Sequence, residues 1–490
     1  MKLIRQLDAV PLLLWCILSF NFIKIINSLS LLECLNSIEG PVIYPNDKDF
    51  KPLIIDQNIR VNYTPSVLVY ALNNKDVQNA VKCAISWQMN ITARSGGHSY
   101  EKYGLGGRDN DIVLDLTFIN SITIDSEAQT ARIGAGNRLG NVYNKLNQAG
   151  FLIPAGSCPS VGIGGHALGG GFGYLGRKYG YACDNIISMQ MINAEGELLH
   201  IDPFSNPDLF FALRGAGKGS FGIVTNFVFR IYPTPSLVTT MELVFNSTNM
   251  TQVYQLFHAY YQVGPSLDND IAFKMRLRND SLSIIGLYLG SSKNATKAME
   301  KFLSKAPEQI KPIVLNETTF FNSIALLYNV NKYEVVNPGH VPNFFKVKSF
   351  FVNIDKELEN RAIDNLVNFL NEINKGPCET FASFDLHGGV SEIHRNNSFI
   401  HRNAAYCIQI ETGWKSKEEG AECVKELNDF GREFQSYTSN FSYQGFIDRD
   451  LDKWQTRYYG DDVFKKLVDI KKVYDPKNLF NFNQSIPVKL

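Results

Sequence analysis

Residues 155–180 read AGSCPSVGIGGHALGGGFGYLGRKYG and contain ten glycines beside a single cysteine and a single histidine. Because fixing a glycine costs more backbone entropy than fixing any other residue, such a stretch predicts neither an ordinary helix nor a strand. Consecutive glycines do expose backbone N–H groups that can surround a phosphate without side chains in the way. The stretch therefore predicts a loop packed against a large phosphate-bearing cofactor, with a thiol next to it.

A dinucleotide fingerprint of the Rossmann type is one interpretation of the same glycines. Gly162, Gly164 and Ala167 match the spacing G-x-G-x-x-A. That fingerprint requires a strand before it and a helix after it. The letters PAGSCP precede it and the glycines at 169–171 follow it, which argues against both elements. We therefore expect a cofactor-binding fold other than the Rossmann fold.

Glycine-rich loops recur on both sides of this stretch, at residues 96–97 and 215–222, and glycine becomes sparser further along the chain. A chain of 490 residues is too long for one simple core. We expect a cofactor-binding domain at 50–235, a substrate-binding domain at 236–445 and a C-terminal segment at 446–490 that returns to the first domain.

Hydrophobic periodicity and turn residues indicate mixed helix and strand along the chain. The expected strands are 66–71, 112–116 and a pair within 186–202 that turns at Glu195-Gly196. The expected helices are 75–89, 139–148, 294–303, 356–373 and one C-terminal helix that is stopped by Asp475-Pro476.

The charges of the chain balance, with 48 Lys and Arg against 48 Asp and Glu. A nucleic-acid-binding protein needs a basic face to neutralise phosphates, so this balance argues against nucleic acid as a partner. The eight cysteines include no Cys-x-x-Cys pair, so no metal site is expected.

Residues 1–28 have the pattern of a cleavable export signal, with a basic start (MKLIR) and a short apolar run at Val10–Phe20. A membrane anchor is the alternative, but Asn21 and Lys24 interrupt the run before it can span a bilayer. We expect a secreted glycoprotein without stable membrane insertion. Asn-x-Ser/Thr acceptors occur at Asn62, Asn90, Asn246, Asn249, Asn279, Asn294, Asn316, Asn396, Asn440 and Asn483.

Two other functions are consistent with parts of the pattern. Cys158 could act as a nucleophile activated by His166 or His98, as in cysteine hydrolases, but no spacing indicates a dyad. The simpler role for His166 is a packed histidine that hydrogen-bonds within its loop. A secreted binding glycoprotein without catalysis explains the acceptor asparagines but not the glycine density in separate loops.

Four motifs, in order, resemble the berberine bridge enzyme-like family. They are ARSGGHSYEKYG (93–104), CPSVGIGGHALGGGFGYLGRKYG (158–180), LRGAGKGSFGIVT (213–225) and the terminal run from YYGDDVFKKLVDIKKVYDPKNLF to QSI. The resemblance covers about residues 34–487 and implies a secreted flavoprotein. The implied fold class is α+β, with a two-part FAD-binding domain of vanillyl-alcohol oxidase type and a substrate domain whose antiparallel sheet is covered by helices.

The resemblance implies FAD that is bonded to the protein at two points. His98 matches the histidine bonded to the 8α carbon of the isoalloxazine, and Cys158 matches the cysteine bonded to carbon 6. Arg94 is expected beside the phosphates. The other expected cofactor-binding residues are Ser95, Gly96, Gly97, Ser99, Val161, Gly162, Gly164, Gly165, His166, Gly170, Gly171, Gly222 and Ile223.

Removal of the export signal with Cys16 leaves an odd number of cysteines, so at least one thiol is not in a disulfide. The resemblance assigns this role to Cys158 and implies a disulfide between Cys34 and Cys83. Cys183, Cys378, Cys407 and Cys423 stay unassigned, with Cys378–Cys407 as a candidate pair.

The catalytic base departs from the family pattern. Members that oxidise alcohols and sugars use tyrosines after the GGG run and in a C-terminal Tyr-x-Asn-Tyr-x-Asp motif. Phe172 and Phe446 stand at these places here, and phenylalanine cannot accept a proton. The resemblance leaves Tyr443 or Tyr100 as the base, or else the family's alcohol-oxidation mechanism does not apply.

Two further positions match the substrate side of the family. Gln409, in YCIQIETGW, stands where the family has a Gln or Glu, and Asp385, in FASFDLHGG, stands where some carbohydrate oxidases place an acidic partner for the base. Each has a structural alternative: Gln409 as an inward strand residue satisfied by the backbone, and Asp385 as a residue of a strand-end turn.

The resemblance implies a monomeric oxidase that transfers a hydride from a hydroxyl-bearing carbon of a small molecule to FAD. Dioxygen (O2) is the expected electron acceptor, giving hydrogen peroxide, because a small residue such as Val161 goes with oxygen access in the family. The first expected substrate is a sugar or oligosaccharide oxidised at its anomeric carbon. The alternatives are oxidation or oxidative cyclisation of a secondary metabolite, and a catalytically degenerate flavin-binding glycoprotein.

Overall fold

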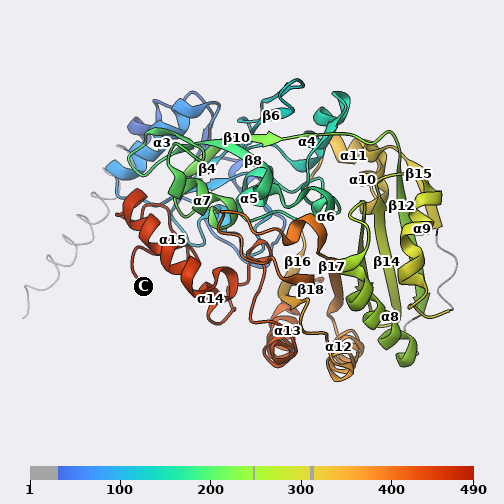
Figure 1. The fold of residues 1–490 in the computed structure, drawn as a ribbon. Coiled ribbons are helices and arrows are strands. Elements are labelled where there is room, and N and C mark those ends of the chain that lie inside the picture. Colours follow the sequence, from blue (N-terminus) through green and yellow to red (C-terminus); the bar gives the residue numbers. More distant parts are fainter. Residues whose placement is uncertain (1–30, 247–248, 309–313) are drawn as a thin grey trace, which may run out of the picture.

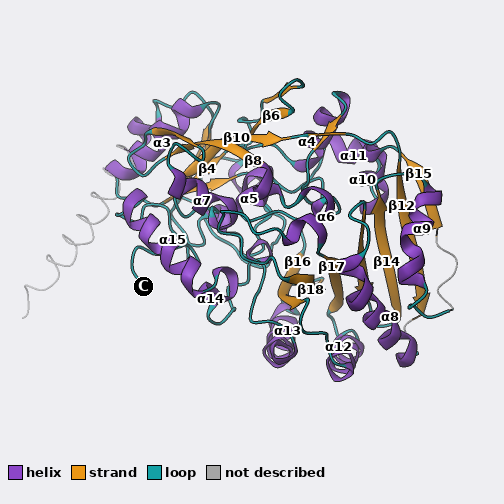
Figure 2. Ribbon diagram, viewed as in Figure 1, coloured by secondary structure: helices purple, strands orange, loops and turns teal. Residues whose placement is uncertain are grey.

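The computed structural model describes residues 31–246, 249–308 and 314–490 (Figure 1). The predicted export signal at 1–28, with Cys16, lies outside these residues. Within the described ranges, no helix combines the length and the apolar character needed to cross a bilayer. Figure 2 shows helices and strands mixed along the chain, which confirms the expected α+β class.

Two small sheets lie in the part of the molecule built from the first half of the chain (Figure 1). The first is mixed, since β1 runs antiparallel to β2 whereas β2, β4 and β3 are parallel. In spatial order it consists of β1 (Val42–Ile43), β2 (Val67–Tyr70), β4 (Ile112–Asp115) and β3 (Ile91–Arg94). The second, which is antiparallel, consists of β5 (Ile122–Asp125), β6 (Thr130–Gly134), β10 (Ile223–Arg230), β8 (Ile186–Ile192) and β9 (Leu198–Ile201), and β7 (Phe151–Leu152) pairs separately with β11 (Tyr232–Pro233).

The later part of the chain builds one large antiparallel sheet. In spatial order its strands are β15 (Val314–Thr318), β12 (Val238–Asn246), β14 (Ser281–Tyr288), β13 (Ile271–Leu277), β17 (Glu379–Leu386), β18 (Ala404–Trp414) and β16 (Phe344–Asn353). Because side chains alternate along a strand, Phe273 and Met275 of β13 enter the apolar core while Lys274 and Arg276 point to the other face. This alternation gives the sheet one apolar face and one polar face.

Helices α8 (Met250–Val263), α9 (Ser292–Leu303), α12 (Asn360–Ile373) and α13 (Gly420–Phe434) pack on the apolar face of the large sheet.

The other labelled helices are α2 (Phe50–Leu53), α3 (Asn74–Ser86), α4 (Leu139–Gln148), α5 (Ile163–Leu168), α6 (Gly176–Tyr179), α7 (Pro207–Ala216), α10 (Phe320–Tyr328), α11 (Lys332–Val336), α14 (Trp454–Tyr459) and α15 (Asp461–Tyr474).

Buried apolar side chains gather in two main clusters. One joins the two small sheets to α14 and α15, through residues such as Tyr458 and Leu467, so the C-terminal residues pack against the first half of the chain. The other lies between the large sheet and its helices. The domain limits 50–235, 236–445 and 446–490 stay predictions, because two clusters of buried side chains do not show at which residue a domain begins or ends.

Two predictions about helices require correction. The short helix α5 forms inside the glycine stretch, where no helix was expected, and it ends where Gly170 and Gly171 take positive φ angles of 107° and 74°. The single C-terminal helix is in fact two, because Gly460, with φ 68°, separates α14 from α15.

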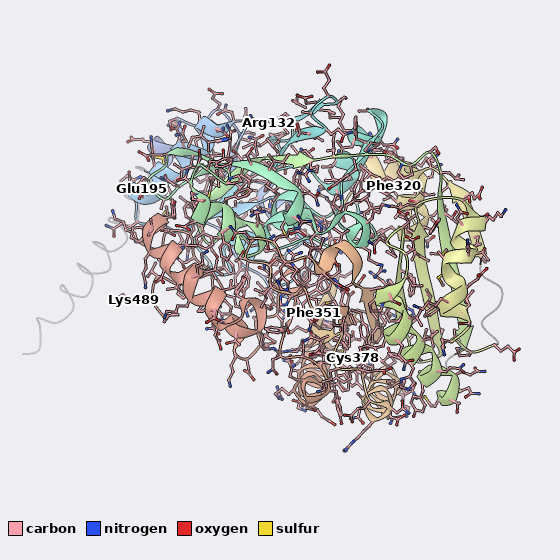
Figure 3. The ribbon with its side chains drawn as sticks, viewed as in Figure 1. Arg132, Glu195, Phe320, Phe351, Cys378 and Lys489 are labelled. Atoms are coloured by element: carbon pink, nitrogen blue, oxygen red, sulfur yellow. A yellow bond between two sulfur atoms is a disulfide. The ribbon has the colours of Figure 1, made fainter. Side chains whose placement is uncertain are left out.

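Two disulfides join described cysteines. Cys34 and Cys83 pair as the resemblance implies, but Cys378 pairs with Cys423, so the candidate pair Cys378–Cys407 is wrong. The physical reason is that α13 carries Cys423 over the start of β17, whereas β18 directs Cys407 to a different buried cluster. Figure 3 shows Cys378 near α12 and α13.

Candidate active site

Two glycine loops meet at the centre of the site, one formed by residues 95–99 after β3 and the other by residues 155–162 before α5. A Cβ atom on Gly96 would lie 2.2 Å from the amide nitrogen of Gly162, and one on Gly162 would lie 2.3 Å from that of Gly96. Only residues without a Cβ let two backbones approach this closely. The glycines therefore bring the two loops, and the side chains that they carry, into direct contact.

The hydroxyl of Ser160 lies between the two side chains that are expected to bond flavin. Its Oγ is 2.8 Å from His98 Nε2 and 3.3 Å from Cys158 Sγ. Both nucleophilic groups can therefore reach nearby positions of one planar ring. Because Ser160 engages Nε2, the nitrogen of His98 without a hydrogen-bond partner among the described residues is Nδ1.

Burial keeps the imidazole of His98 neutral. Loss of solvation lowers its pKa to about 3, and the nearby His340 and Arg138 add to this effect. The His340 ring lies 5.2 Å from the His98 ring, and Arg138 Nη2 lies 3.0 Å from His340 Nε2. A neutral imidazole retains the lone pair that forms a bond to carbon.

A cavity of about 490 Å³ extends from these loops to the polar face of the large sheet. Gly165 borders open space in it, because no atom lies within 4 Å of the position of an added Cβ. A flat ring can thus pack directly on the backbone of α5. The cavity and its glycine surface fit FAD, which the loops around His98, Cys158 and Gly222 would hold.

Lys218 is a partly buried cation on the cavity wall that the sequence analysis missed. Its Nζ donates to the carbonyl of Gln444 at 3.3 Å and forms no ion pair with any residue that the structure describes. The fold leaves room for its side chain, since a Cβ on Gly169 would lie 2.1 Å from Lys218 Cε. An unpaired buried charge is unfavourable, so this position fits a negatively charged ligand such as FAD.

Replacing Lys218 with methionine is expected to reduce the flavin content of the purified protein. Burial lowers the pKa of Lys218 to about 8, below the ordinary value of 10.5 that applies in the unfolded chain. Between these values the unfolded state binds more protons, so the stability of the flavin-free wild type rises with pH by up to about 1.4 kcal/mol per pH unit. The variant should lose this slope.

Urea unfolding of the flavin-free wild type and of Lys218→Met, at several pH values between 8 and 10.5, measures how the free energy of unfolding changes with pH. The flavin absorbance of the purified proteins measures their flavin content. Lys297→Met, on the exposed side of α9, is the control and should change neither. If the free energy of unfolding changed with pH equally in the wild type and in Lys218→Met, the lowered pKa of Lys218 would be contradicted.

Three strands supply a polar wall of the cavity. In register across β13, β17 and β18, one row consists of Arg276, Ser383 and Gln409, and the next consists of Lys274, Asp385 and Cys407. Lys274 Nζ lies 3.0 Å from Asp385 Oδ1, whereas the buried Oδ2 has no hydrogen-bond partner among the described residues. Asp385 therefore lines the cavity with one carboxylate oxygen paired to lysine and the other, buried one without a hydrogen-bond partner among the described residues.

Tyr100, Gln409 and Glu411 form a second polar group. Gln409 Nε2 donates to Glu411 Oε2 at 2.9 Å, and burial raises the pKa of Glu411. Both residues neighbour the Tyr100 hydroxyl, whose pKa burial raises well above its usual value. The Tyr100 ring stacks on Phe446 with centroids 5.8 Å apart. Gln409 and the Tyr100 hydroxyl can therefore donate hydrogen bonds to a ligand in the cavity.

Tyr443, Phe172 and Phe446 form an aromatic wall. The Tyr443 ring lies 4.7 Å from Phe172 and 5.1 Å from Phe446, and its hydroxyl accepts from the Gly171 N–H at 3.1 Å. A Cβ on Gly445 would lie 2.1 Å from the Tyr443 ring, so the glycine leaves room for it. Burial raises the pKa of Tyr443. The geometry favours a packing role for this tyrosine over proton transfer.

Most of the predicted site residues do line one cavity. They are Tyr443, Tyr100, Asp385, Gln409, His98, Cys158, Arg94, Ser95, Gly96, Gly97, Ser99, Val161, Gly162, Gly164, Gly165, His166, Gly222 and Ile223. Gly170 and Gly171 are not among its lining residues and instead form the turn after α5. The guanidinium of Arg94 donates to Asp115 and to the Leu53 carbonyl, so it is not directed to a phosphate.

His166 has the packed role rather than a catalytic one. Its Nε2 accepts from the Gly156 N–H at 2.8 Å, and burial lowers its pKa to about 3. The partner of Cys158 is Ser160 instead. This arrangement does not support a cysteine-hydrolase dyad.

A buried ion network anchors the chain directly after the loop that carries His98. Glu101 accepts from Lys346 Nζ at 3.0 Å and from Arg449 Nε at 2.6 Å, and Lys346 also contacts Asp448. These residues come from three segments that are distant in the sequence. The network thus connects the first glycine loop to β16 and to the C-terminal segment.

Comparisons with known proteins agree with this geometry. Residues 65–202 match a family model described as FAD binding domain, and residues 442–487 match one described as berberine and berberine like. Berberine bridge enzyme-like 18 of Arabidopsis thaliana is 30% identical, over 94% of this chain and 92% of its own.

Solved structures show the same fold. Berberine bridge enzyme-like 1 of Physcomitrella patens has a TM-score of 0.88 and is 33% identical, over 94% of this chain and 99% of its own. A glucooligosaccharide oxidase of Acremonium strictum, whose structure is described as revealing a novel flavinylation, has a TM-score of 0.85 and is 25% identical, over 94% of this chain and 98% of its own. These matches confirm the expected FAD-binding fold.

Proposed function

Since the chain belongs to the berberine bridge enzyme-like family of FAD-linked oxidoreductases, we propose that it oxidises a hydroxyl-bearing carbon of a sugar or oligosaccharide. The observation that carries this proposal is Asp385, a lysine-paired carboxylate with one buried oxygen left free on the cavity wall. The likeness to a glucooligosaccharide oxidase supports a sugar as the substrate.

FAD, when bound, supplies the acceptor for the hydride. The Asp385 carboxylate takes the hydroxyl proton while the C–H electron pair leaves the same carbon and the carbonyl forms. Lys274 holds the carboxylate in place, and Gln409 and Tyr100 donate hydrogen bonds that orient the sugar. The aromatic wall keeps water away from the reacting carbon.

We propose O2 as the final acceptor, with hydrogen peroxide as the product, and the secretory pathway as the location. Val161 lines the cavity beside the cofactor loops, which supports oxygen access. The disulfides Cys34–Cys83 and Cys378–Cys423 support folding in an oxidising compartment.

A panel of sugars, oligosaccharides and simple alcohols tests the proposed function. With the purified enzyme, a sugar substrate should bleach the flavin absorbance without oxygen and release hydrogen peroxide in air. If the protein is yellow but no sugar bleaches it, while an alcohol or another metabolite does, the substrate class is wrong. A yellow protein that none of these compounds reduces would contradict oxidase activity.

We also propose that FAD is bonded to both His98, through Nδ1, and Cys158. Acid precipitation should then leave flavin on the wild-type polypeptide and on the single variants His98→Ala and Cys158→Ala, and release it from the double variant. Absorbance of pellet and supernatant measures this result. Complete release from either single variant would refute a bond at the other residue, and Ser160→Ala provides a control that removes neither nucleophile.

A further inference from the structure

The two edges of the large sheet differ in how they are covered. At one edge, Phe351 of β16 donates its N–H to the Phe441 carbonyl at 3.2 Å and accepts from the Ser439 N–H at 3.0 Å. Further along the same strand, the Phe345 carbonyl accepts from the side chain of Asn58 at 3.0 Å. Two other segments of the chain therefore occupy the outer hydrogen-bonding groups of β16.

The opposite edge, formed by β15, has no such cover among the residues that the structure describes. β15 pairs with β12 on one side, and no described residue hydrogen-bonds to the backbone groups on its other side. Figure 1 shows β15 at the outside of the sheet, beside α9. An uncovered edge can pair with a strand of another chain, and proteins often block it with a lysine, a proline or a bulge. The strand Val314–Thr318 contains no lysine or proline and pairs with β12 without a bulge.

Two of the Asn-x-Thr acceptors flank this edge, one on each face of the sheet. Leu315 packs against the apolar core, and the Glu317 carboxylate accepts from the Ser292 N–H at 2.6 Å, so both side chains lie on the side of α9. Because side chains alternate along a strand, Asn316 lies on the opposite face, where it is exposed. Asn294 is exposed in the first turn of α9. Sugars on these two asparagines would therefore stand on both sides of the free edge.

We propose that N-linked glycans on Asn316 and Asn294 cover the free edge of β15 and prevent it from pairing with the same strand of a second copy of this chain. A glycan is bulky and hydrated, so one on each face leaves no room for an added strand. Two identical edges pair about a twofold axis, which requires that both copies expose β15. The inference rests on the secretory location proposed above and does not depend on the oxidase activity.

The modification itself is a group transfer carried out by the host cell. The side-chain nitrogen of each asparagine forms a bond to the anomeric carbon of an oligosaccharide carried on a lipid diphosphate. The bond from that carbon to the diphosphate breaks, and the amide loses one proton, so no oxidant or reductant is needed. The acceptor motif Asn-x-Thr is complete at both sites, with Thr318 after Asn316 and Thr296 after Asn294.

Mass spectrometry of peptides from the protein secreted by a eukaryotic host tests whether the two sites carry glycans. A peptide N-glycosidase converts each glycosylated asparagine to aspartate, and we expect aspartate at positions 294 and 316. An unmodified asparagine at either position, in a protein that carries glycans at other acceptors, would overturn the inference and leave the secretory location intact. A protein without any glycan would contradict the secretory location as well.

Size-exclusion chromatography with light scattering, at several concentrations of the secreted protein, tests the role of the glycans. The wild type should stay monomeric. The double variant Asn294→Gln/Asn316→Gln should associate as its concentration rises, with an apparent mass that approaches about twice that of the monomer. Thr296→Ala/Thr318→Ala, which keeps both asparagines but destroys the acceptor motifs, should associate in the same way. Flavin absorbance shows that each variant is folded.

Two further variants connect the association to β15. Asn62→Gln/Asn440→Gln is the matched control, because it removes two exposed acceptors beside the segments that cover β16, and it should stay monomeric. Asn294→Gln/Asn316→Lys should also stay monomeric, since a lysine blocks a strand edge without a glycan. A monomeric Asn294→Gln/Asn316→Gln variant would overturn the inference. Association that the lysine does not prevent would overturn it too, because the copies would then meet at a surface other than β15.

Discussion

Replacing Asp385 with asparagine is expected to lower kcat by roughly 10²- to 10⁴-fold while flavin stays bound. The amide has nearly the same shape as the carboxylate but cannot take the hydroxyl proton, and neither Phe172 nor Phe446 can substitute for it. Because the substrate still finds a hydrogen-bonding group there, KM should change much less than kcat. Rapid anaerobic reduction of the flavin by substrate measures the chemical step directly.

Asp270→Asn provides the matched control. Asp270 also pairs with a lysine, Lys178, at 2.6 Å, but it does not line the cavity. This variant should reduce its flavin at the wild-type rate. A similar loss in both variants would mean that the ion pairs stabilise the large sheet only, and an unaffected Asp385→Asn would leave Tyr100 as the remaining candidate for the base.

Replacing Gly165 with leucine is expected to abolish most flavin binding without harm to the fold. An added Cβ meets no atom within 4 Å, and leucine favours the helical conformation that α5 requires, so stability without flavin should stay equal or rise by up to about 1 kcal/mol. The new side chain would instead occupy the surface on which the ring packs. Overpacking of that kind costs about 1–3 kcal/mol, or roughly 10- to 100-fold in cofactor affinity.

The ratio of flavin to protein absorbance measures the expected loss of flavin. Urea unfolding of the flavin-free protein measures the expected stability of the fold. Gly376→Leu, at an exposed position after α12 with only an ordinary contact at 3.7 Å, should keep its flavin. Gly96→Ala should instead lose stability, because its Cβ would strike the backbone of Gly162. Normal flavin content in Gly165→Leu would mean that the cofactor does not pack on α5.

Local pattern predicted much of the fold. The amphipathic helix at 139–148 has the predicted limits, and the turn at Glu195-Gly196 joins β8 to β9 as expected. The glycine density at 155–180 predicted a loop packed against a large cofactor, but it did not predict the close approach of this loop to the loop of Gly96. That contact depends on how two separate loops meet, which periodicity within one segment cannot specify.

The polar wall of the cavity was harder to predict, for a similar reason. Lys274, Arg276 and Arg278 alternate with apolar residues, which indicates a polar face on a strand, but sequence alone does not tell a solvated face from a cavity wall. Lys218 stands within GAGKGS, where it resembles any loop lysine until its burial is known. Cys423 pairs with Cys378 because of helix packing that neither cysteine's neighbours reveal.

The ion pairs of Glu101 also set the order in which the protein matures. Glu101 is held by Lys346, 245 residues later, and by Arg449, 348 residues later. While the ribosome is still translating those residues, the nascent chain can pair Glu101 with Arg60 but lacks the two later partners of the network, Lys346 and Arg449. We therefore expect the loop of His98 to take its final position, and flavin to bind, only after synthesis of these residues, so that a chain that stops short of residue 449 is colourless.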